Sequence, residues 1–422
     1  MRTLNIVRRS LQAVRSRHAA GMALMLLMAA CATPKKAVIM APPPPIVVPP
    51  PPPRATPLPE AAQNRVALLV PLTGANAPVG QSIANAANLA LLDAGDARVN
   101  LRIYDTAPGA AAAAARALAE GAGLFLGPLL AGDVRAVEAV AAGGNVPVLS
   151  FSNDASLAGA NVFILGLQPG QSISRTIAYA RSRGIERFAA LVPVGVYGQR
   201  AQTAFVRAVS AAGGRSTAVI SYSRDPARMA AAARTVTAWD ARNKAGTPTI
   251  RPDGTVAAPK VAPLPFQALL IADSGSVAAQ FMPALSKLGV TPGVAIVMGT
   301  ELWNNEPALG RVGALRGALF SSVADDRFRK LAERYRSKFG NNPSRLASLG
   351  YDAALLVNSI AGTWALGAPF PRAALTSRDG FTGIDGPFRF TPAHVAERGL
   401  EVQQIDAGGV VTVAPAAKGF GS

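Results

Sequence analysis

Apolar residues along the chain gather in short continuous runs, and longer stretches with helical spacing separate these runs. A continuous apolar run is typical of a parallel β-strand buried on both faces, because both sets of alternating side chains must then be apolar. From residue 64 onward such runs predict the strands Val66–Val70, Leu101–Asp105, Leu124–Gly127, Val146–Ser150, Val162–Leu165, Phe188–Val192, Ala218–Ser221, Ala268–Asp273, Val294–Gly299 and Gly317–Ser321.

Between the predicted strands, apolar residues recur three and four positions apart, which is the spacing of one face of an amphipathic helix. This spacing is clear over residues 83–91, 328–339 and 346–360. Regular alternation of strands and helices predicts a doubly wound parallel sheet in an α/β protein. The strands are too many for one compact unit. We therefore expect two sheet-centred lobes joined by hinge strands, with a cleft outside the carboxyl ends of the strands.

The first 31 residues predict a secretory signal that ends at a modified cysteine. A basic stretch at residues 1–20 precedes an apolar run at residues 21–30, which is too short to span a bilayer as a helix. The run ends Leu-Met-Ala-Ala-Cys31 and resembles the lipobox of bacterial lipoproteins, so we expect acylation of Cys31 to anchor the chain. By the same resemblance, Ala32 implies the periplasmic face of the outer membrane. Cleavage without lipidation is the alternative.

Residues 32–62 are rich in proline and predict a stiff linker. Polyproline II rises about 3.1 Å per residue, so about 30 residues would extend on the order of 90 Å. Such a spacer would hold a globular body away from a membrane surface. A ligand for a proline-recognition module is the alternative interpretation of this segment.

From residue 64 onward we expect the chain to be divided between two lobes. The expected organisation is a first lobe from residues 64–167 and 322–380, a second lobe from residues 168–321 and 381–415, and within the second lobe a long insertion loop at residues 240–267. The insertion is rich in proline and glycine and is too long for an ordinary connection. Its length is typical of a functional loop, such as a partner contact, or of a disordered segment.

The composition of the chain excludes several kinds of functional site. Cys31 is the only cysteine, and the two histidines are His18 and His394. The chain therefore offers no internal disulfide, no cysteine or histidine-rich metal site and no nucleophile elbow beside His394, and we expect no enzyme, no metal and no cofactor. The net charge of +18 suits anionic partners such as a membrane surface, or it reflects dispersed surface arginines. No basic block carries interleaved aromatic residues, so nucleic acid is not an expected partner.

A series of short motifs follows in a fixed order from the first strand to the end of the chain. They are Pro71–Gly74, Tyr104–Thr106, Gly127–Leu129, Val146–Asn153, Val196–Gly198, Gly350–Ala353 and Phe381–Phe390. Their order resembles the type I periplasmic binding proteins of the leucine-binding kind over about residues 64–415. With the lipobox, the Gly-Pro-Leu turn and the Leu-Ser-Phe-Ser-Asn loop look most like the penicillin-binding protein activators, which are outer-membrane lipoproteins that stimulate a peptidoglycan synthase. The helical-repeat N-terminal domain of those proteins is replaced here by the proline-rich linker.

The resemblance implies a ligand site in the cleft. Carried over residue by residue, the site comprises Thr73, Ser150, Ser152 and Asn153 from the first lobe and Tyr197, Asp273 and Glu301 from the second. Hydroxyl and amide groups would bind a carboxylate, and Asp273 or Glu301 would pair with an ammonium group. Each position also fits a turn or helix-capping role after a strand, and Asp273 is an example.

Two functions of different classes remain from the sequence. The first is a regulatory lipoprotein that binds a penicillin-binding protein, which is a peptidoglycan synthase. The second is a substrate-binding lipoprotein of an amino-acid or peptide ABC transporter, which would hold a small amino-acid-like ligand. The long proline-rich linker favours the first, because a transport protein rarely needs so long a tether.

Overall fold

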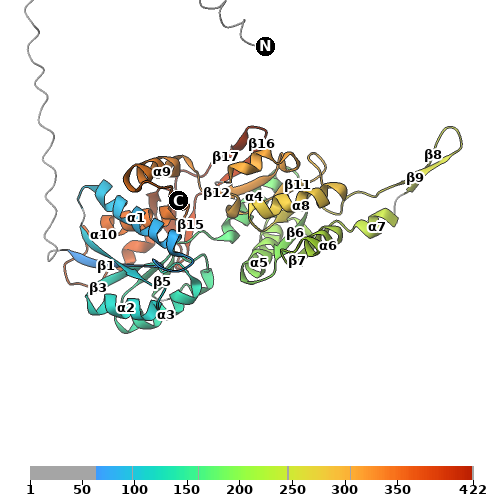
Figure 1. Ribbon diagram of the computed structural model, residues 1–422. Helices are drawn as coiled ribbons and strands as arrows, with labels where there is room; N and C mark the ends of the chain where they lie inside the picture. The colour runs from blue at the N-terminus through green and yellow to red at the C-terminus, as the bar shows by residue number, and fades with distance from the viewer. Residues whose placement is uncertain (1–62, 97, 160, 245–246, 305, 421–422) are drawn as a thin grey trace, which may run out of the picture. The chain divides into compact units, whose positions relative to one another are not determined.

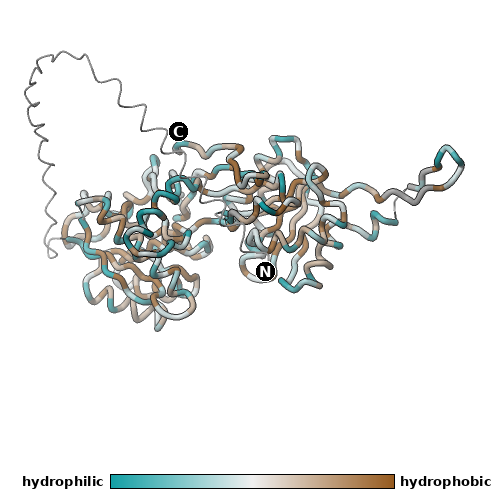
Figure 2. The backbone as a smooth tube through the Cα atoms, turned by 45° about the horizontal axis from the view of Figure 1, so that its top comes forward, coloured by the Kyte–Doolittle hydropathy of each residue, from teal (hydrophilic) through white to brown (hydrophobic). Residues whose placement is uncertain are grey.

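The computed structural model describes residues 63–96, 98–159, 161–244, 247–304 and 306–420. The expected signal peptide, the acylated Cys31 and the proline-rich linker lie outside the described residues. Strands and helices alternate along the described chain, as the apolar pattern predicts (Figure 1). Hydrophilic and hydrophobic positions also alternate along the helices, as amphipathic helices require (Figure 2).

The first sheet is wholly parallel and has the order β2-β1-β3-β4-β5. Its strands are β1 (Asn64–Val70), β2 (Val99–Asp105), β3 (Ala122–Leu126), β4 (Val148–Ser150) and β5 (Val162–Ile164). The helices that pack against it are α1 (Ala77–Ala94), α2 (Ala110–Ala119), α3 (Ala131–Gly143), α9 (Asp326–Phe339) and α10 (Ala347–Ile360).

Helices cover both faces of this first sheet. Val66 and Leu68 of β1 lie in one core with α1, α9 and α10, while Leu69 lies in the opposite core with α2 and α3. All three side chains are buried. This two-sided burial is the physical reason why β1 is a continuous apolar run and not an alternating one.

The second sheet has the order β17-β16-β12-β11-β10-β6-β7. Its strands are β6 (Arg187–Pro193), β7 (Arg215–Tyr222), β10 (Ala268–Ile271), β11 (Ile296–Met298), β12 (Leu319–Ser322), β16 (Glu401–Asp406) and β17 (Gly409–Ala414). The first five of these pair in parallel, and β16 and β17 add an antiparallel edge. One face packs against α4 (Pro169–Ser182) and α5 (Val196–Ala211), and the other against α6 (Pro226–Val236) and α8 (Gly275–Lys287).

A third, antiparallel sheet corrects one expected boundary. It consists of β13 (Phe381–Gly383), β14 (Gly386–Phe390) and β15 (Ala396–Arg398). We expected residues 381–415 in the second lobe, but Phe388 and Phe390 pack into the core of the first sheet beside α10. Only β16 and β17 join the second sheet. The alternating aromatic residues of β14 show that one face is buried, but local sequence does not show which core receives it.

The insertion at residues 240–267 also differs from the expected loop. It holds a short helix, α7 (Trp239–Lys244), followed by an antiparallel hairpin of β8 (Thr247–Ile250) and β9 (Val256–Lys260). The turn between the two strands contains Pro252 and Gly254, and Gly254 has a φ of +80°. Proline suits the start of such a turn and glycine tolerates the left-handed conformation, so the turn residues that suggested a loop instead close a hairpin.

Three chain segments pass between the two main sheets. Residues 165–168 run from β5 to α4, residues 323–325 run from β12 to α9, and residues 399–400 run from β15 to β16. Hinge strands were expected between the lobes, but none of these three segments forms a strand. Ser172 at the start of α4 donates a hydrogen bond of 2.6 Å to the carbonyl of Ser321, which holds α4 against the end of β12.

A buried ionic network fastens the third sheet to α10. Asp385, in the turn between β13 and β14, accepts hydrogen bonds of 2.8 Å from Arg345 Nη1 and from Ser348 Oγ. Asp352 of α10 accepts hydrogen bonds from the backbone amides of Ile384 and Asp385, at 2.6 and 3.3 Å. Burial, together with the neighbouring charge of Asp385, raises the pKa of Asp352 to about 7.

Replacing Asp385 by asparagine should lower the free energy of unfolding by about 3 kcal/mol, because the buried Arg345 then loses a charged partner. Urea unfolding followed by circular dichroism at neutral pH measures the change. Asp326→Asn is the matched control, since the Arg329–Asp326 pair is exposed and should change stability by less than about 0.5 kcal/mol. Equal losses for the two variants would contradict the role of the network.

Candidate functional site

The loop after β4 uses its hydroxyl groups to hold its own backbone. Ser150 is fully buried, and its Oγ donates to the carbonyl of Pro128 at 3.0 Å and accepts from the amide of Ser152 at 3.0 Å. Ser152 Oγ accepts from the amide of Asp154 at 3.2 Å. These bonds fix the path of the loop and place Asn153 and Asp154 at the carboxyl edge of the first sheet.

Thr73 lies at the same edge, after β1. Its Oγ1 donates to Asp105 Oδ2 at 2.7 Å, and Asp105 Oδ1 accepts from the amides of Leu72 and Ala107 at 2.7 and 3.0 Å. Burial acts to raise the pKa of Asp105, but these hydrogen bonds outweigh it and the pKa is lowered. The exposed Thr73 hydroxyl is therefore one of several donors that stabilise the Asp105 carboxylate.

On the second sheet, Tyr197 and Glu301 come together. The Tyr197 hydroxyl lies 3.0 Å from Thr300 Oγ1 and donates to Glu301 Oε1 at 3.2 Å. Glu301 Oε2 is buried and has no hydrogen-bond partner among the described residues. Burial raises the pKa of Glu301 to about 7, and burial with the nearby Glu301 charge raises the pKa of Tyr197 far above its usual value. Of these two groups, only the Glu301 carboxyl changes its protonation state near neutral pH.

Asp273 is also buried, but its carboxylate is fully partnered. Arg224 binds it with two hydrogen bonds, from Nε at 2.9 Å and Nη2 at 2.8 Å, and the Tyr222 hydroxyl donates at 2.7 Å. The amide of Ser274 adds a fourth bond at 2.8 Å. A guanidinium that binds one carboxylate with two parallel bonds satisfies both its charge and its geometry. Asp273 therefore offers no free acceptor to a ligand ammonium group.

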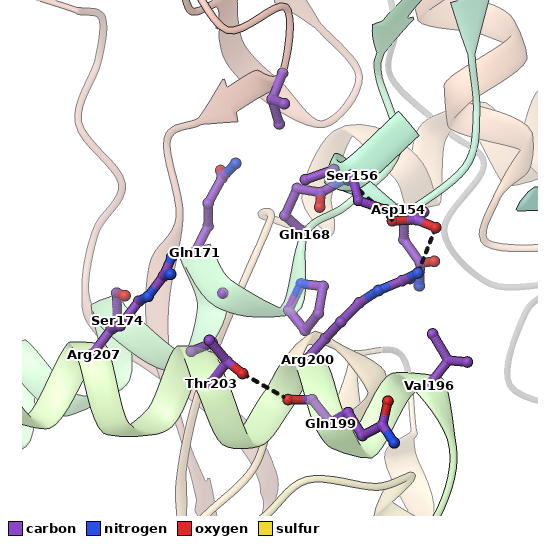
Figure 3. A pocket seen from close by; sticks show the side chains of 16 residues that line it. Asp154, Ser156, Gln168, Gln171, Ser174, Val196, Gln199, Arg200, Thr203 and Arg207 are labelled. Carbon is purple, nitrogen blue, oxygen red and sulfur yellow. Dashed lines mark hydrogen bonds and ion pairs between the residues drawn. The ribbon is translucent and has the colours of Figure 1, made fainter. Parts of the chain in front are cut away.

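A cavity of about 680 Å³ lies between the loop after β4 and the helices α4 and α5 (Figure 3). Its walls are the 3-10 helix η2 (Ala155–Leu157), the start of α4, one face of α5 and Val395. Asp154 and Arg200 form an ion pair across it, which joins the first-sheet loop to α5. Bonds from Ser156 and the charge of Arg200 overcome the effect of burial and lower the pKa of Asp154.

Of the predicted site residues, only Asn153 lines this cavity. The structure brings Ser150, Ser152 and Asn153 together after β4, and separately brings Tyr197 and Glu301 together beside β11. Thr73 and Asp273 lie in hydrogen-bond networks of their own, described above. No other predicted residue borders the cavity.

Sequence reasoning missed several residues that line the cavity: Gln168, Gln171, Gln199, Arg200, Thr203 and Arg207. A signal for part of this set is present in the chain. Val196, Arg200, Thr203 and Arg207 follow one another at spacings of four, three and four, so they form one stripe on α5. Such a stripe is also typical of a helix face in contact with solvent, so sequence alone does not mark it as a site.

A second, small cavity of about 10 Å³ lies where the three segments between the sheets meet, lined by Leu167, Val323 and Leu400. Glu301 and Arg398 also border it. Arg398 is 8% exposed, and its Nη2 donates to the carbonyl of Leu165 at 3.0 Å. Its Nε and Nη1 have no partner among the described residues. An acidic side chain, Glu301, and a basic side chain, Arg398, therefore both lie at these connecting segments.

The chemistry available at these places is hydrogen bonding and charge pairing. His394 stacks on Phe163, and its Nδ1 lies 2.5 Å from the carbonyl of Gly159. Within the described ranges, no group of three or more His, Cys, Asp or Glu side chains is placed to hold a metal ion. In the same part of the chain, no helix is long and apolar enough to cross a membrane. Two sheet-centred lobes, three connecting segments and a cavity lined by both polar and apolar side chains beside the loop after β4 are the features of a two-lobed binding protein.

The comparison with protein families gives the same class. The family described as periplasmic binding protein matches residues 63–410, and the chain belongs to this family. The expected fold, with two doubly wound parallel-sheet lobes of the type I kind, is thereby confirmed. Among curated proteins, no sequence matches the chain.

Several solved structures share this fold. The leucine binding protein LivK from Thermotoga maritima has a TM-score of 0.58 and 19% identity, over 84% of this chain and 98% of that one. A branched chain amino acid ABC transporter periplasmic ligand-binding protein from Burkholderia xenovorans has a TM-score of 0.62 and 16% identity, over 85% and 97%. Full-length LpoA from Haemophilus influenzae has a TM-score of 0.59 and 19% identity, over 84% of this chain and 59% of LpoA. At these identities the likeness concerns the fold alone.

The Glu301 environment predicts a pH-dependent stability. Because burial raises the pKa of Glu301 to about 7, the folded protein holds this proton where the unfolded chain releases it, and stability falls as pH rises from about 5 to about 8. Glu301→Gln removes this titration. The loss of unfolding free energy over that interval should be smaller in the variant by about 2 kcal/mol, measured by urea unfolding at each pH.

Asp352 titrates in the same interval in both proteins, so the difference between the two curves isolates Glu301. The exposed Glu333→Gln serves as the control and should follow the wild-type curve. A Glu301→Gln curve that coincides with the wild type would show that Glu301 ionises freely.

Proposed function

We propose that the chain is a periplasmic lipoprotein, anchored to the outer membrane through Cys31, that binds and regulates a penicillin-binding protein with peptidoglycan synthase activity. In this proposal the two-lobed body is a regulatory surface and catalyses no reaction. The observation that carries the proposal is the state of Asp273, an acid that the family resemblance offers for the ammonium group of an amino acid and that Arg224 and Tyr222 already bind.

A site that binds an amino acid tightly needs an unpaired acceptor for the ammonium group and free donors for the carboxylate. Arg224 and Tyr222 already bind both oxygens of Asp273. The Ser150 hydroxyl already donates to the carbonyl of Pro128 in the loop after β3, and the Oγ atoms of Ser150 and Ser152 accept from backbone amides of their own loop. Opening these bonds for a ligand would leave buried polar groups without partners, which is costly. The arrangement supports a body that acts through its surfaces.

Other observations support the same proposal. The fold is shared with LpoA of Haemophilus influenzae, and the lipobox and loop motifs resemble the penicillin-binding protein activators. A proline-rich linker, for which polyproline II geometry predicts a length on the order of 90 Å, suits a protein that must reach from one membrane toward a synthase held at another. Transport proteins deliver ligand at short range and rarely need such a linker.

Binding of the lipidated full-length protein to purified, detergent-solubilised penicillin-binding proteins tests the proposal, together with glycan polymerisation and peptide cross-linking rates. We expect saturable binding to one synthase and a change in at least one of its two rates. Isothermal titration with amino acids and small peptides should give no heat of binding at micromolar concentrations. Absence of binding to every synthase would contradict the proposal.

The cavity of about 680 Å³ favours a second function, that of a ligand-binding protein of an ABC transporter. Its volume lies within the usual range of small-molecule sites. Amide side chains and Arg207 on its wall suit a polar ligand with a carboxylate. A solute binding protein of the same fold from Rhodopseudomonas palustris was solved in complex with benzoate, which makes small carboxylates a ligand class to test alongside amino acids.

If this second function holds, a small carboxylate should bind with micromolar affinity, and Arg207→Ala should weaken binding about tenfold, because it removes an exposed cation from the cavity wall. Arg215→Ala is the matched control, since Arg215 is exposed on β7 away from the cavity and should have no effect. Titration calorimetry with amino acids, benzoate and 4-hydroxybenzoate measures both. Equal affinities for the two variants would exclude the cavity as the binding site.

A further inference from the structure

The hairpin of the insertion is specified by its own turn. The amide of Arg251 donates to the carbonyl of Thr255 at 2.8 Å, and the amide of Gly254 donates to the carbonyl of Arg251 at 2.9 Å. Asp253 Oδ1 accepts from both the amide and the hydroxyl of Thr255, at 2.9 and 2.6 Å. Pro252 and Gly254 supply the conformations that this turn needs. The tip is thus held in one shape by local bonds.

The base of the insertion is held by one buried cation. Arg242 of α7 is 9% exposed, and its Nε donates to the carbonyl of Ala262 at 2.8 Å, just after β9. Its Nη1 donates to the carbonyls of Thr237 and Leu288, at 3.2 and 3.0 Å. Arg242 therefore ties the chain before the hairpin, the chain after it and the end of α8 to one point. The hairpin follows α7 in the chain and lies beyond it in Figure 1.

The hairpin presents an apolar pair to solvent. Ile250 and Val256 lie opposite each other across the two strands. They are 74% and 70% exposed, which makes them the two most exposed large apolar side chains among the described residues. An isolated two-stranded hairpin is marginally stable in water, and an exposed apolar pair at its end gains little without a surface to bury it. A partner surface that covers Ile250 and Val256 would explain why two apolar side chains stand at this place.

Three features indicate what kind of partner this is. Pro248 in β8 and Pro259 in β9 lack an amide hydrogen, which opposes edge-to-edge pairing with a second copy of the chain. The turn holds an acid, Asp253, and no aromatic residue, which suits an anionic lipid surface poorly. Arg251 is exposed beside the pair, and its side chain has no partner among the described residues. A cation next to an apolar pair is complementary to an apolar groove with an acidic rim.

We infer that the β8–β9 hairpin is a docking element, and that Ile250 and Val256 enter an apolar groove with an acidic rim on a partner protein. The inference rests on the proposed function for the identity of that partner, a peptidoglycan synthase. The contact is made by side chains at the end of the hairpin, with Arg251 as the peripheral charge. The bonds of Asp253 and Arg251 within the turn limit the loss of freedom on binding, because they fix the shape of the tip in advance.

The test uses the full-length protein with Ile250→Ser and Val256→Ser combined. Its affinity for purified, detergent-solubilised penicillin-binding proteins should fall about tenfold or more, measured by biolayer interferometry. Val294→Ser is the matched control, since Val294 is 60% exposed on the same lobe and should leave the affinity within about twofold. Arg251→Ala should weaken the salt dependence of binding. Thermal unfolding of each variant verifies that the fold is retained.

The outcomes separate this inference from the function on which it rests. A synthase bound equally well by the double variant and by the wild type would overturn the docking inference and leave the proposed function standing. Failure of every synthase to bind the wild type would overturn both. Hairpin-dependent binding to vesicles of anionic phospholipid, or hairpin-dependent dimers in sedimentation, would overturn the protein groove in favour of a lipid surface or a second copy.

Discussion

Burial of both faces of each main sheet is the constraint on which the other features of this protein depend. Val66 and Leu68 of β1 pack toward α1 and α10, while Leu69 packs toward α2 and α3, so every residue of the strand core must be apolar. The second sheet is covered in the same way by α4 and α5 on one face and α6 and α8 on the other. Parallel strands also end at one common edge, and this edge is where polar side chains can gather.

Charge at that edge is balanced within the protein. Arg224 neutralises Asp273 and Arg200 neutralises Asp154, while hydroxyl and amide donors stabilise the charge of Asp105. Glu301 is the exception, because burial without a cation leaves its carboxyl easily protonated near neutral pH. The Asp154–Arg200 ion pair holds the loop after β4 against α5. Polar side chains that remain open to solvent line the cavity along α5.

The insertion adds a different kind of surface. The edge of the first sheet is polar and internally bonded, whereas the hairpin offers exposed apolar side chains on an ordered element. The Arg242 side chain ties the base of the insertion to backbone carbonyls from three separate segments.

The sequence by itself determined the parallel strands of the two main sheets and the amphipathic helices between them, because continuous apolar runs and helical spacing are local consequences of burial. It did not show the β8–β9 hairpin or the antiparallel strands β13 to β17. It also determined the family, because motifs such as Val146–Asn153 lie in one order along the chain. Only the tertiary structure decided that β14 packs on the first sheet, since Phe388 and Phe390 would be equally apolar against either core. It also decided that Arg224 binds Asp273 and that Arg200 and Arg207 line a cavity. Such pairings depend on distance in space between residues far apart in the chain, and local pattern carries no information about that distance.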